Sequence, residues 1–292
     1  MGAIKSSLGL NEPDKLATRY GGVPVVYVES EEDNYVYGEC WFKDRLSKLE
    51  FKTAAVKCAA DGCDAVLNAV TMERQAGNLA WGIVDRDIVL SKELWDLVYE
   101  TNDEAFERAK PFGNEIKVLC RWEMESYLVD GEALEHIQTG FNKKVERPLS
   151  DVFQELLDHC HVLLPHATIN AVLHLHKFEG AGDGYTNRFS TPEQVLADIQ
   201  KNYIPKLQPD GQADYDRHLP LVTAFDHPGA SAEERLNSLL RRVHGKALLE
   251  RFFHASHKIQ VDVKGLLVKR IKEQSRIPAE IETFVDMVAC SH

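Results

Sequence analysis

The stretch LAWGIVDRDIVL, residues 79–90, joins an apolar run directly to two aspartates that are separated by one arginine. The run from Leu79 to Val84 is short, continuous and apolar, as is typical of a strand buried in a parallel sheet. Asp85 and Asp87 follow at its end. Charged groups in that position either mark the end of a strand in solvent or belong to a functional site.

Strand-like and helix-like segments alternate on both sides of this stretch. Three more strands are predicted, at residues 23–29, 49–56 and 116–120. Strands that alternate with helices indicate a parallel sheet with right-handed crossovers. We therefore expect an α/β fold over about residues 1–145, in which a parallel sheet is flanked by helices.

The helices of this first half are predicted from apolar periodicity and from residues that begin or end a helix. An amphipathic helix over 64–75 is expected to end near Gly77. Ser91 is placed to cap another helix over 92–99.

The second half, residues 146–292, is expected to be mostly helical and to complete the domain. Apolar residues recur with a helical period in residues 151–164, 190–203 and 231–253. Two capping boxes, Thr191 with Gln194 and Ser231 with Glu234, mark the start of the second and third segments.

The charge of the chain is acidic overall but uneven. The net charge is −12, which argues against a general coat for nucleic acid. Residues 235–276 nevertheless contain eleven Lys or Arg against three Asp or Glu, a local +8. This basic segment is a candidate phosphate-binding face, a docking face for the acidic remainder or a partner, or simply a set of solvated helix surfaces.

The six cysteines are scattered and form no CxxC pair. This pattern is neither a disulfide framework nor a zinc ribbon, so we expect reduced thiols and a cytoplasmic protein. No run approaches the roughly 18 apolar residues of a membrane span, and the first residues lack a signal-peptide pattern. No membrane role is expected.

Acidic residues follow three of the predicted strands. Glu29 ends the first strand, and Asp33 comes four residues later. Asp85 and Asp87 end the third; in an extended segment, residues two apart point the same way. Sites in open parallel sheets form beyond the carboxyl ends of the strands, so we expect these acids to share one site.

The segment RWEMESYL, after the fourth strand, adds Glu123 and Glu125. Glu125 has a simpler alternative, an ion pair with Arg121 one helical turn away. Carboxylates that cluster stay ionised together only around a cation. Oxygen ligands select a hard divalent ion, Mg²⁺ or Mn²⁺, which suits the hydrolysis of phosphodiesters.

The order of these acids resembles a TOPRIM domain, the metal-binding α/β fold of topoisomerases, primases and OLD-type nucleases. VYVESEEDNYVY is similar to the opening motif of that family, and GIVDRD is similar to its DxD motif. The resemblance implies that Glu29 is the catalytic glutamate and that Asp85 and Asp87 bind the metal. WEMESYL resembles the ENYL segment of a bacterial TOPRIM-like family, which implies that Glu125 completes the metal site.

A second segment of that bacterial family, GK-x-L-L, resembles VHGKALLERF and makes Lys246 a candidate cation for the scissile phosphate. Within the basic segment, Arg241, Arg242 and Arg251 are candidate phosphate contacts beside it. Arg86 lies between the two aspartates and is a candidate either for binding phosphate or for neutralising the site.

The resemblance extends to the TOPRIM effectors of PARIS phage-defence systems. It implies a metal-dependent nuclease that cuts nucleic acid, with host RNA such as tRNA as the expected target. It also implies an ABC-type ATPase as a partner and a homodimer as the active form. The chain has no GxxxxGK[ST] motif of its own. The alternative is a catalytically inactive module that binds and regulates the ATPase.

Overall fold

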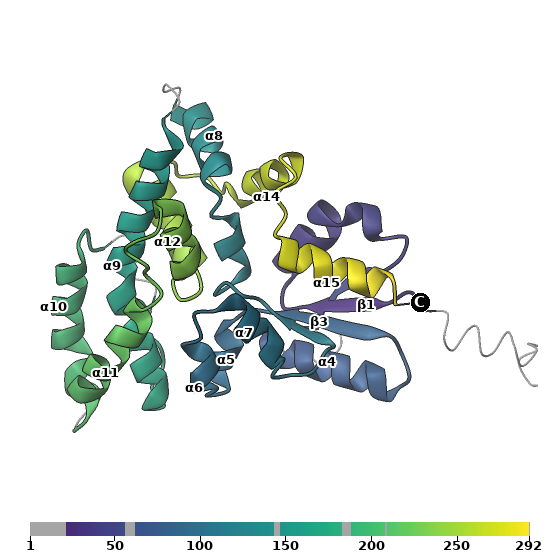
Figure 1. Ribbon diagram of the computed structural model, residues 1–292, viewed down its shortest axis with the longest axis horizontal. Coiled ribbons are helices and arrows are strands. Elements are labelled where there is room, and N and C mark those ends of the chain that lie inside the picture. Colours follow the sequence, from purple (N-terminus) through teal and green to yellow (C-terminus); the bar gives the residue numbers. More distant parts are fainter. Residues whose placement is uncertain (1–21, 56–61, 143–146, 183–187, 208, 292) are drawn as a thin grey trace, which may run out of the picture. The chain divides into compact units, whose positions relative to one another are not determined.

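The computed structural model describes residues 22–55, 62–142, 147–182, 188–207 and 209–291. It is an α/β structure with a four-stranded parallel sheet and many helices (Figure 1). The chain divides into two compact units. We call Met1–Val84, Lys110–Val118 and Ile277–His292 the sheet unit, and Asp85–Ala109 and Leu119–Arg276 the helical unit.

This division differs from the predicted boundary between residues 145 and 146. The chain leaves the sheet unit after Val84 and again after Val118, and it returns at Ile277. Each unit is therefore assembled from separate stretches of the chain, whereas the prediction assumed one continuous stretch for each. Residues 1–21 and 143–146 lie outside the described part.

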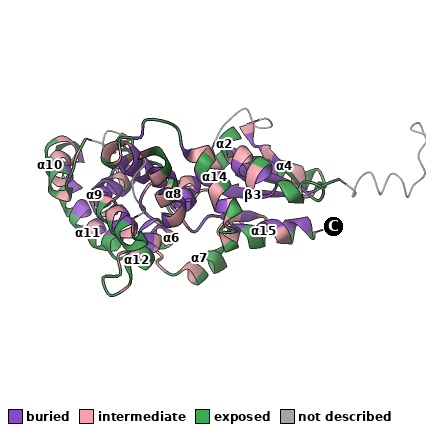
Figure 2. Ribbon diagram, turned by 90° about the horizontal axis from the view of Figure 1, so that it is seen from above, coloured by how far each residue is buried: buried purple, intermediate pink, exposed green. Residues whose placement is uncertain are grey.

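All four predicted strands are present, each slightly shorter than expected. They are β1 (Val25–Val28), β2 (Glu50–Thr53), β3 (Ala80–Val84) and β4 (Ile116–Val118). Their order in the sheet is β2-β1-β3-β4, and every pair is parallel. All five residues of β3 are buried (Figure 2), which explains the continuous apolar run in the sequence.

Helices cover both faces of this sheet. Figure 1 shows α4 (Cys63–Gln75) on one face and α15 (Ala279–Ala289) on the other. The apolar side chains of α4 approach closely because β3 has a glycine at Gly82, where an added Cβ would lie 2.6 Å from Val66 Cγ1. Gly77, with φ of +84°, follows the end of α4 as predicted.

Ion pairs fix the two edges of the sheet unit to α15. Lys117 in β4 pairs with Glu280 at 2.7 Å. Arg45 Nε donates to Asp286 Oδ1 at 2.8 Å. Arg45 ends a short 3₁₀ helix, η2 (Lys43–Arg45), which follows α2 (Glu31–Asn34) and the π-helix η1 (Tyr35–Trp41).

The helical unit is organised around one long helix, α9 (Leu149–Leu175). Helices α8, α10, α11 and α12 pack against it (Figure 1). The elements of this unit are α5 (Asp87–Ser91), α6 (Trp95–Val98), α7 (Asp103–Ala109), η3 (Met124–Leu128), α8 (Gly131–Asn142), α9, α10 (Pro192–Asn202), η5 (Ile204–Leu207), α11 (Gly211–Thr223), α12 (Ala232–Leu239), α13 (Gly245–Glu250), η6 (Arg251–Ser256) and α14 (Lys264–Glu273). None of the helices in the described ranges has the length and apolar character that crossing a membrane would require.

Two helix predictions are wrong in detail. Ser91 does not cap a helix over 92–99, because it is the last residue of α5. The segment 231–253 is not one helix. It breaks after α12, where the carbonyl of Leu240 accepts a hydrogen bond from Trp122 N at 2.8 Å. Both predicted capping boxes, which begin α10 and α12, are confirmed.

We expect Gly82→Ala to destabilise the protein by about 1–3 kcal/mol, because its methyl group would overlap Val66 and also approach Ile116 and Val70. Urea unfolding followed by circular dichroism measures the change. Gly140→Ala is the matched control: among the described residues, no atom outside its own helix backbone lies within 4 Å of the added Cβ, so the helix should be unchanged or up to about 1 kcal/mol more stable. Equal midpoints for Gly82→Ala and wild type would contradict this packing.

Candidate active site

Glu29 directly follows β1 in the sheet unit, as the sequence predicts. The Cys63 thiol donates a hydrogen bond to Glu29 Oε1 at 2.9 Å. The next residue, Ser30, caps α2 together with Asp33 in a capping box. Asp33 Oδ2 accepts from the backbone and the hydroxyl of Ser30, so the spacing of four between Glu29 and Asp33 has a local structural cause.

Asp85 and Asp87 begin the helical unit, but the segment between them is not extended. Arg86 has helical backbone angles, φ −65° and ψ −24°, and α5 begins at Asp87. The expectation that the two aspartates point the same way along an extended strand is therefore wrong. Asp85 is partly buried and accepts a hydrogen bond from Met124 N at 3.0 Å, whereas Asp87 is exposed.

Arg86 is fully buried, and backbone carbonyls take up its guanidinium, so its predicted role as a phosphate contact is not supported. Its guanidinium donates to the carbonyls of Cys120, Leu97 and Glu100 at 2.7, 3.1 and 2.6 Å and lies over the Phe106 ring at 4.0 Å. Burial lowers the pKa of Arg86 to about 10, so it stays charged at neutral pH. Its role is structural.

Glu123, which the sequence analysis named among the acids after the fourth strand without giving it a role, lies together with His244, which it did not select, in the helical unit. His244 Nδ1 lies 3.3 Å from Glu123 Oε2, and the other carboxylate oxygen accepts a hydrogen bond from Lys246 N at 2.7 Å. The side chain of Glu123 is 16% exposed and that of His244 is 35% exposed. The glutamate thus holds a histidine whose ring is open to solvent.

The two groups shift each other's pKa. Burial acts to raise the pKa of Glu123, but the hydrogen bonds and positive charge of His244 and Lys246 outweigh it and hold that pKa below its ordinary value. Burial acts to lower the pKa of His244, but the hydrogen bond to Glu123 and the charges of Glu123 and Asp87 raise it. The effect of Asp87 places one carboxylate of the DxD motif in the electrostatic environment of this pair.

Glu125 is engaged differently from either prediction. Lys264 Nζ lies 2.7 Å from Glu125 Oε1. Arg121 instead donates to Ser126 O and to Asn237 Oδ1. Because an ammonium group already lies against this carboxylate, the predicted role of Glu125 as a metal ligand is not supported.

Gly245 explains how Lys246 comes to lie beside Glu123. A Cβ at Gly245 would be 2.3 Å from Ser126 N and 2.4 Å from Ser126 Cα. Backbone cannot yield as a flexible side chain can, so only glycine allows α13 to begin against η3. The glycine of the GK-x-L-L segment is therefore a packing requirement.

Most of the predicted phosphate contacts in the basic segment are buried or paired inside the helical unit. Arg242 and Arg251 are 1% and 3% exposed, and Arg251 donates to Phe189 O at 2.9 Å. Arg241 pairs with Asp103 at 2.5 Å. Lys246 is exposed.

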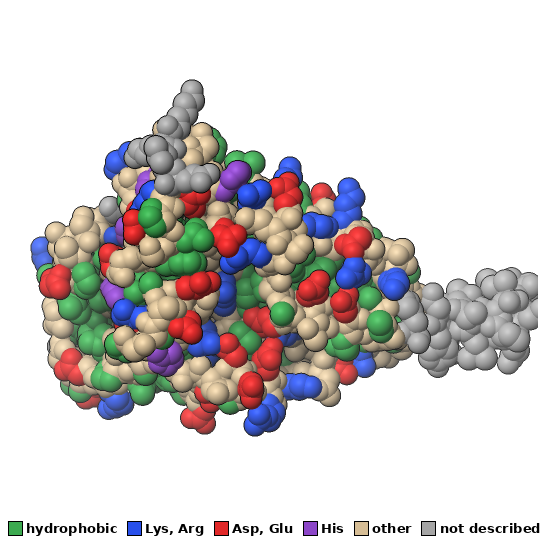
Figure 3. Space-filling model, turned by 45° about the horizontal axis from the view of Figure 1, so that its top comes forward, with side chains coloured by type: hydrophobic (Ala, Val, Ile, Leu, Met, Phe, Trp, Pro, Cys, Tyr) green, Lys and Arg blue, Asp and Glu red, His purple; other side chains and the backbone are tan. Residues whose placement is uncertain are grey.

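The same segment docks onto acidic residues elsewhere in the unit. Arg276 pairs with Asp130 and Glu132, both at 2.7 Å, in the same way that Lys264 pairs with Glu125. Of the three readings of the basic segment, docking onto the acidic remainder describes these residues. Figure 3 shows basic and acidic side chains interspersed over the face that it draws.

The donors predicted for a metal fit a hard cation only in part. Asp85 and Asp87 supply carboxylate oxygens in the helical unit, whereas Glu29 belongs to the sheet unit. Within either unit, no three described His, Cys, Asp or Glu residues bring ligand atoms within 4.8 Å of one another. A cation held by Asp85 and Asp87 would therefore take its remaining ligands from water or substrate, as Mg²⁺ commonly does.

Comparison with protein-family models finds no match to this chain, and comparison with curated proteins finds none either. The TOPRIM resemblance therefore stays a prediction from the sequence motifs. The signal for the missed pair was present in the same motifs: Glu123 lies in WEMESYL, and His244 directly precedes the glycine of the GK-x-L-L segment.

We expect Glu123→Gln to lower the pKa of His244, because the substitution removes the carboxylate that favours the protonated ring. An NMR titration of the histidine ring protons measures this pKa. Glu125→Gln is the matched control, since Glu125 is in the same segment but pairs with Lys264. A pKa for His244 that is unchanged in Glu123→Gln would show that the pair does not exist in solution.

The same pair predicts a pH window for stability. Because the pKa of His244 is raised in the folded protein, the pair stabilises the fold at pH values below the ordinary pKa of histidine. This stabilisation is lost as the pH rises through the raised pKa. Because the pKa of Glu123 is lowered, the pair also stabilises the fold at pH values above the ordinary pKa of glutamate. This stabilisation is lost as the pH falls through the lowered pKa. The difference in unfolding free energy between wild type and Glu123→Gln should therefore be largest from about pH 4.3 to 6.5. Urea unfolding at several pH values checks this; a constant difference would contradict it.

Proposed function

We propose that this protein is a metal-dependent hydrolase that cuts phosphodiester bonds in nucleic acid. The observation that carries the proposal is the Glu123–His244 pair, whose partly exposed imidazole lies in the field of Asp87. A histidine held by a carboxylate is a common proton-transfer group. Asp85 accepts a hydrogen bond from Met124 N, next to Glu123, and the backbone of the exposed Lys246 donates to Glu123 itself. An oxygen donor for a divalent ion and a cation beside this pair suit phosphoryl chemistry.

Each residue has a distinct part in this proposal. Glu123 accepts the Nδ1 proton of His244, which leaves Nε2 as the atom that accepts or donates a proton at the substrate. Lys246 is exposed and offers its ammonium to a phosphoryl oxygen. Asp85 and Asp87 would hold Mg²⁺ or Mn²⁺; when bound, such an ion polarises a phosphoryl oxygen and makes bound water more acidic.

Glu29, the catalytic glutamate implied by the TOPRIM resemblance, stays in the proposal on that resemblance alone. Its carboxylate accepts the Cys63 thiol proton, which is compatible with an ionised carboxylate. The nucleic-acid target, with RNA such as tRNA favoured, also rests on the resemblance. So do the ABC-type ATPase partner, the homodimer and the role in antiviral defence, whereas the expected cytoplasmic location rests on the scattered cysteines.

One observation favours the alternative, a regulatory module without catalysis. Of the cations predicted to receive phosphate, Arg86, Arg242 and Arg251 are buried and Arg241 is paired with Asp103. A nuclease that binds along a strand normally presents several exposed cations. The alternative predicts that the chain binds its ATPase partner but cuts nothing.

We expect Asp87→Asn to reduce cleavage at least about 100-fold, because it removes a charged metal ligand and part of the field at His244. The assay incubates total tRNA and plasmid DNA with purified protein in Mg²⁺, in Mn²⁺ or in EDTA. Asp216→Asn, an exposed carboxylate on α11, is the matched control and should cut as wild type does. Metal-dependent cutting of one substrate would also choose between RNA and DNA.

Two outcomes would count against this mechanism. Cutting by Asp87→Asn at the wild-type rate would remove Asp87 from the site. If wild type cuts neither substrate, alone or with the ATPase partner present, the regulatory module becomes the better description.

A further inference from the structure

Arg242 is a buried cation without a hydrogen-bond acceptor. It is 1% exposed, and its Nε and Nη1 atoms have no hydrogen-bond partner among the described residues. The other two buried arginines differ, since Arg86 donates to three carbonyls and Arg251 to one. Burial lowers the pKa of Arg242 to about 10, so the side chain stays charged at neutral pH.

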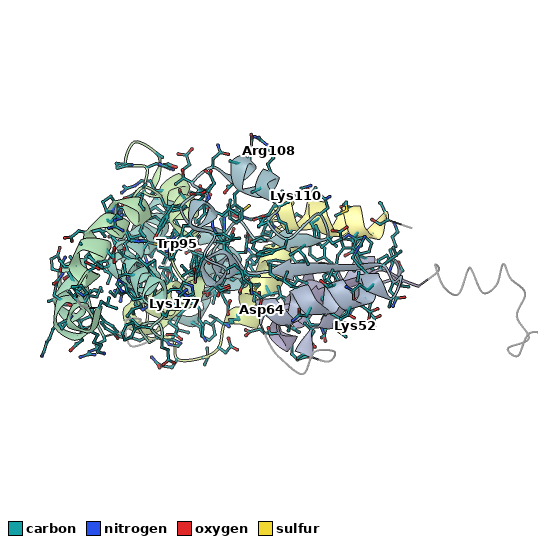
Figure 4. All side chains as sticks on the ribbon, turned by 90° about the horizontal axis from the view of Figure 1, so that it is seen from below. Lys52, Asp64, Trp95, Arg108, Lys110 and Lys177 are labelled. Atoms are coloured by element: carbon teal, nitrogen blue, oxygen red, sulfur yellow. The ribbon has the colours of Figure 1, made fainter. Side chains whose placement is uncertain are left out.

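The walls around this guanidinium are aromatic. It lies over the Trp122 ring at 4.4 Å and near the Tyr99 ring at 5.6 Å. Tyr99 in turn stacks on Trp95, which is labelled in Figure 4, at 6.3 Å. Trp122 Nε1 is a second buried donor without a partner. Two side chains in contact therefore both carry unused N–H groups.

This arrangement is costly unless an acceptor completes it. A buried charge is normally paired, and an unmade hydrogen bond in the interior costs more than a made one contributes. The nearby cation Arg86 adds repulsion, which is visible in the part that Arg242 plays in lowering the pKa of Arg86. An anion with oxygen acceptors would satisfy these donors.

We propose that Arg242 and Trp122 form an internal binding site for a terminal phosphate of the substrate. This inference rests on the proposed function. Trp122 links the site to the Glu123–His244 pair, because its ring contacts the His244 ring edge-on at 5.6 Å. Between Arg242 and Lys246 the chain passes from buried to exposed, so a ligand enters past His244.

The burial of Arg242 also specifies which phosphate it receives. A phosphodiester inside a strand continues on both sides, whereas a terminal phosphate continues on one side only. A terminal phosphate can reach a cation that is 1% exposed, whereas a phosphodiester inside a strand cannot easily do so. The substrate class is thus nucleic acid with a phosphorylated end.

The test compares two oligonucleotides of one sequence, with and without a 5′-phosphate, and a third with a 3′-phosphate. Binding to the full chain is measured by calorimetry in EDTA, so that no cleavage occurs. We expect a phosphorylated end to bind at least about tenfold more tightly than the unphosphorylated strand, as one charge-assisted hydrogen bond provides. Inorganic phosphate should raise the unfolding temperature, and succinate should not.

Two substitutions locate the effect. Arg242→Met should abolish the preference for phosphate and leave the ligand-free protein as stable or more stable, because an apolar side chain replaces an unpaired buried charge. Arg241→Met, the neighbouring residue paired with Asp103, should keep the preference. Arg242→Gln removes the charge, should also lose the preference, and provides a second variant if the methionine protein does not fold.

Several results would overturn the site. These are equal binding of all three strands by wild type, an equal response to succinate, or a preference that survives in Arg242→Met or Arg242→Gln. Because binding is measured without metal, the two proposals fail separately. A preference for phosphorylated ends without any cleavage would refute the hydrolase and support the phosphate site. Cleavage without such a preference would support the hydrolase and refute the phosphate site.

Discussion

The buried guanidinium of Arg86 joins the two stretches of chain from which the helical unit is made. It donates to Leu97 and Glu100 in the stretch that follows β3, and to Cys120 in the stretch that follows β4. Its donors spread in a fixed plane and can reach several acceptors at once. A lysine in this position would offer a single point of attachment. The position of Asp85 and Asp87, on either side of Arg86, therefore depends on this one buried side chain.

The parts of the fold that the sequence predicts are those that short-range patterns decide. The four strands follow from apolar runs, and the two capping boxes follow from residues three apart. The wrong predictions come from contacts between distant residues. The helix predicted over 231–253 breaks where Leu240 bonds to Trp122 and where Gly245 packs against Ser126. No local pattern carries that information, and the same is true of the boundary between the units.

In the candidate site, too, the sequence predicts what short-range patterns decide and misses what contacts between distant residues decide. The motifs selected Asp85, Asp87 and Lys246, and of these Asp87 and Lys246 are exposed in the structure. Counting charges could not show that Arg242 and Arg251 are buried, because burial depends on neighbours far away in the chain. The pairing of Glu123 with His244 was missed for a related reason: the two residues meet only because α13 begins against η3.

The discontinuous sheet unit also bears on the order in which the protein folds as it is made. Helix α15, which covers one face of the sheet, follows every stretch of the helical unit in the chain. On the ribosome, the helical unit therefore emerges in full while the sheet still lacks α15. The usual order of folding, in which the N-terminal part folds first, is reversed here: the unit that contains the first strand is the last to be completed.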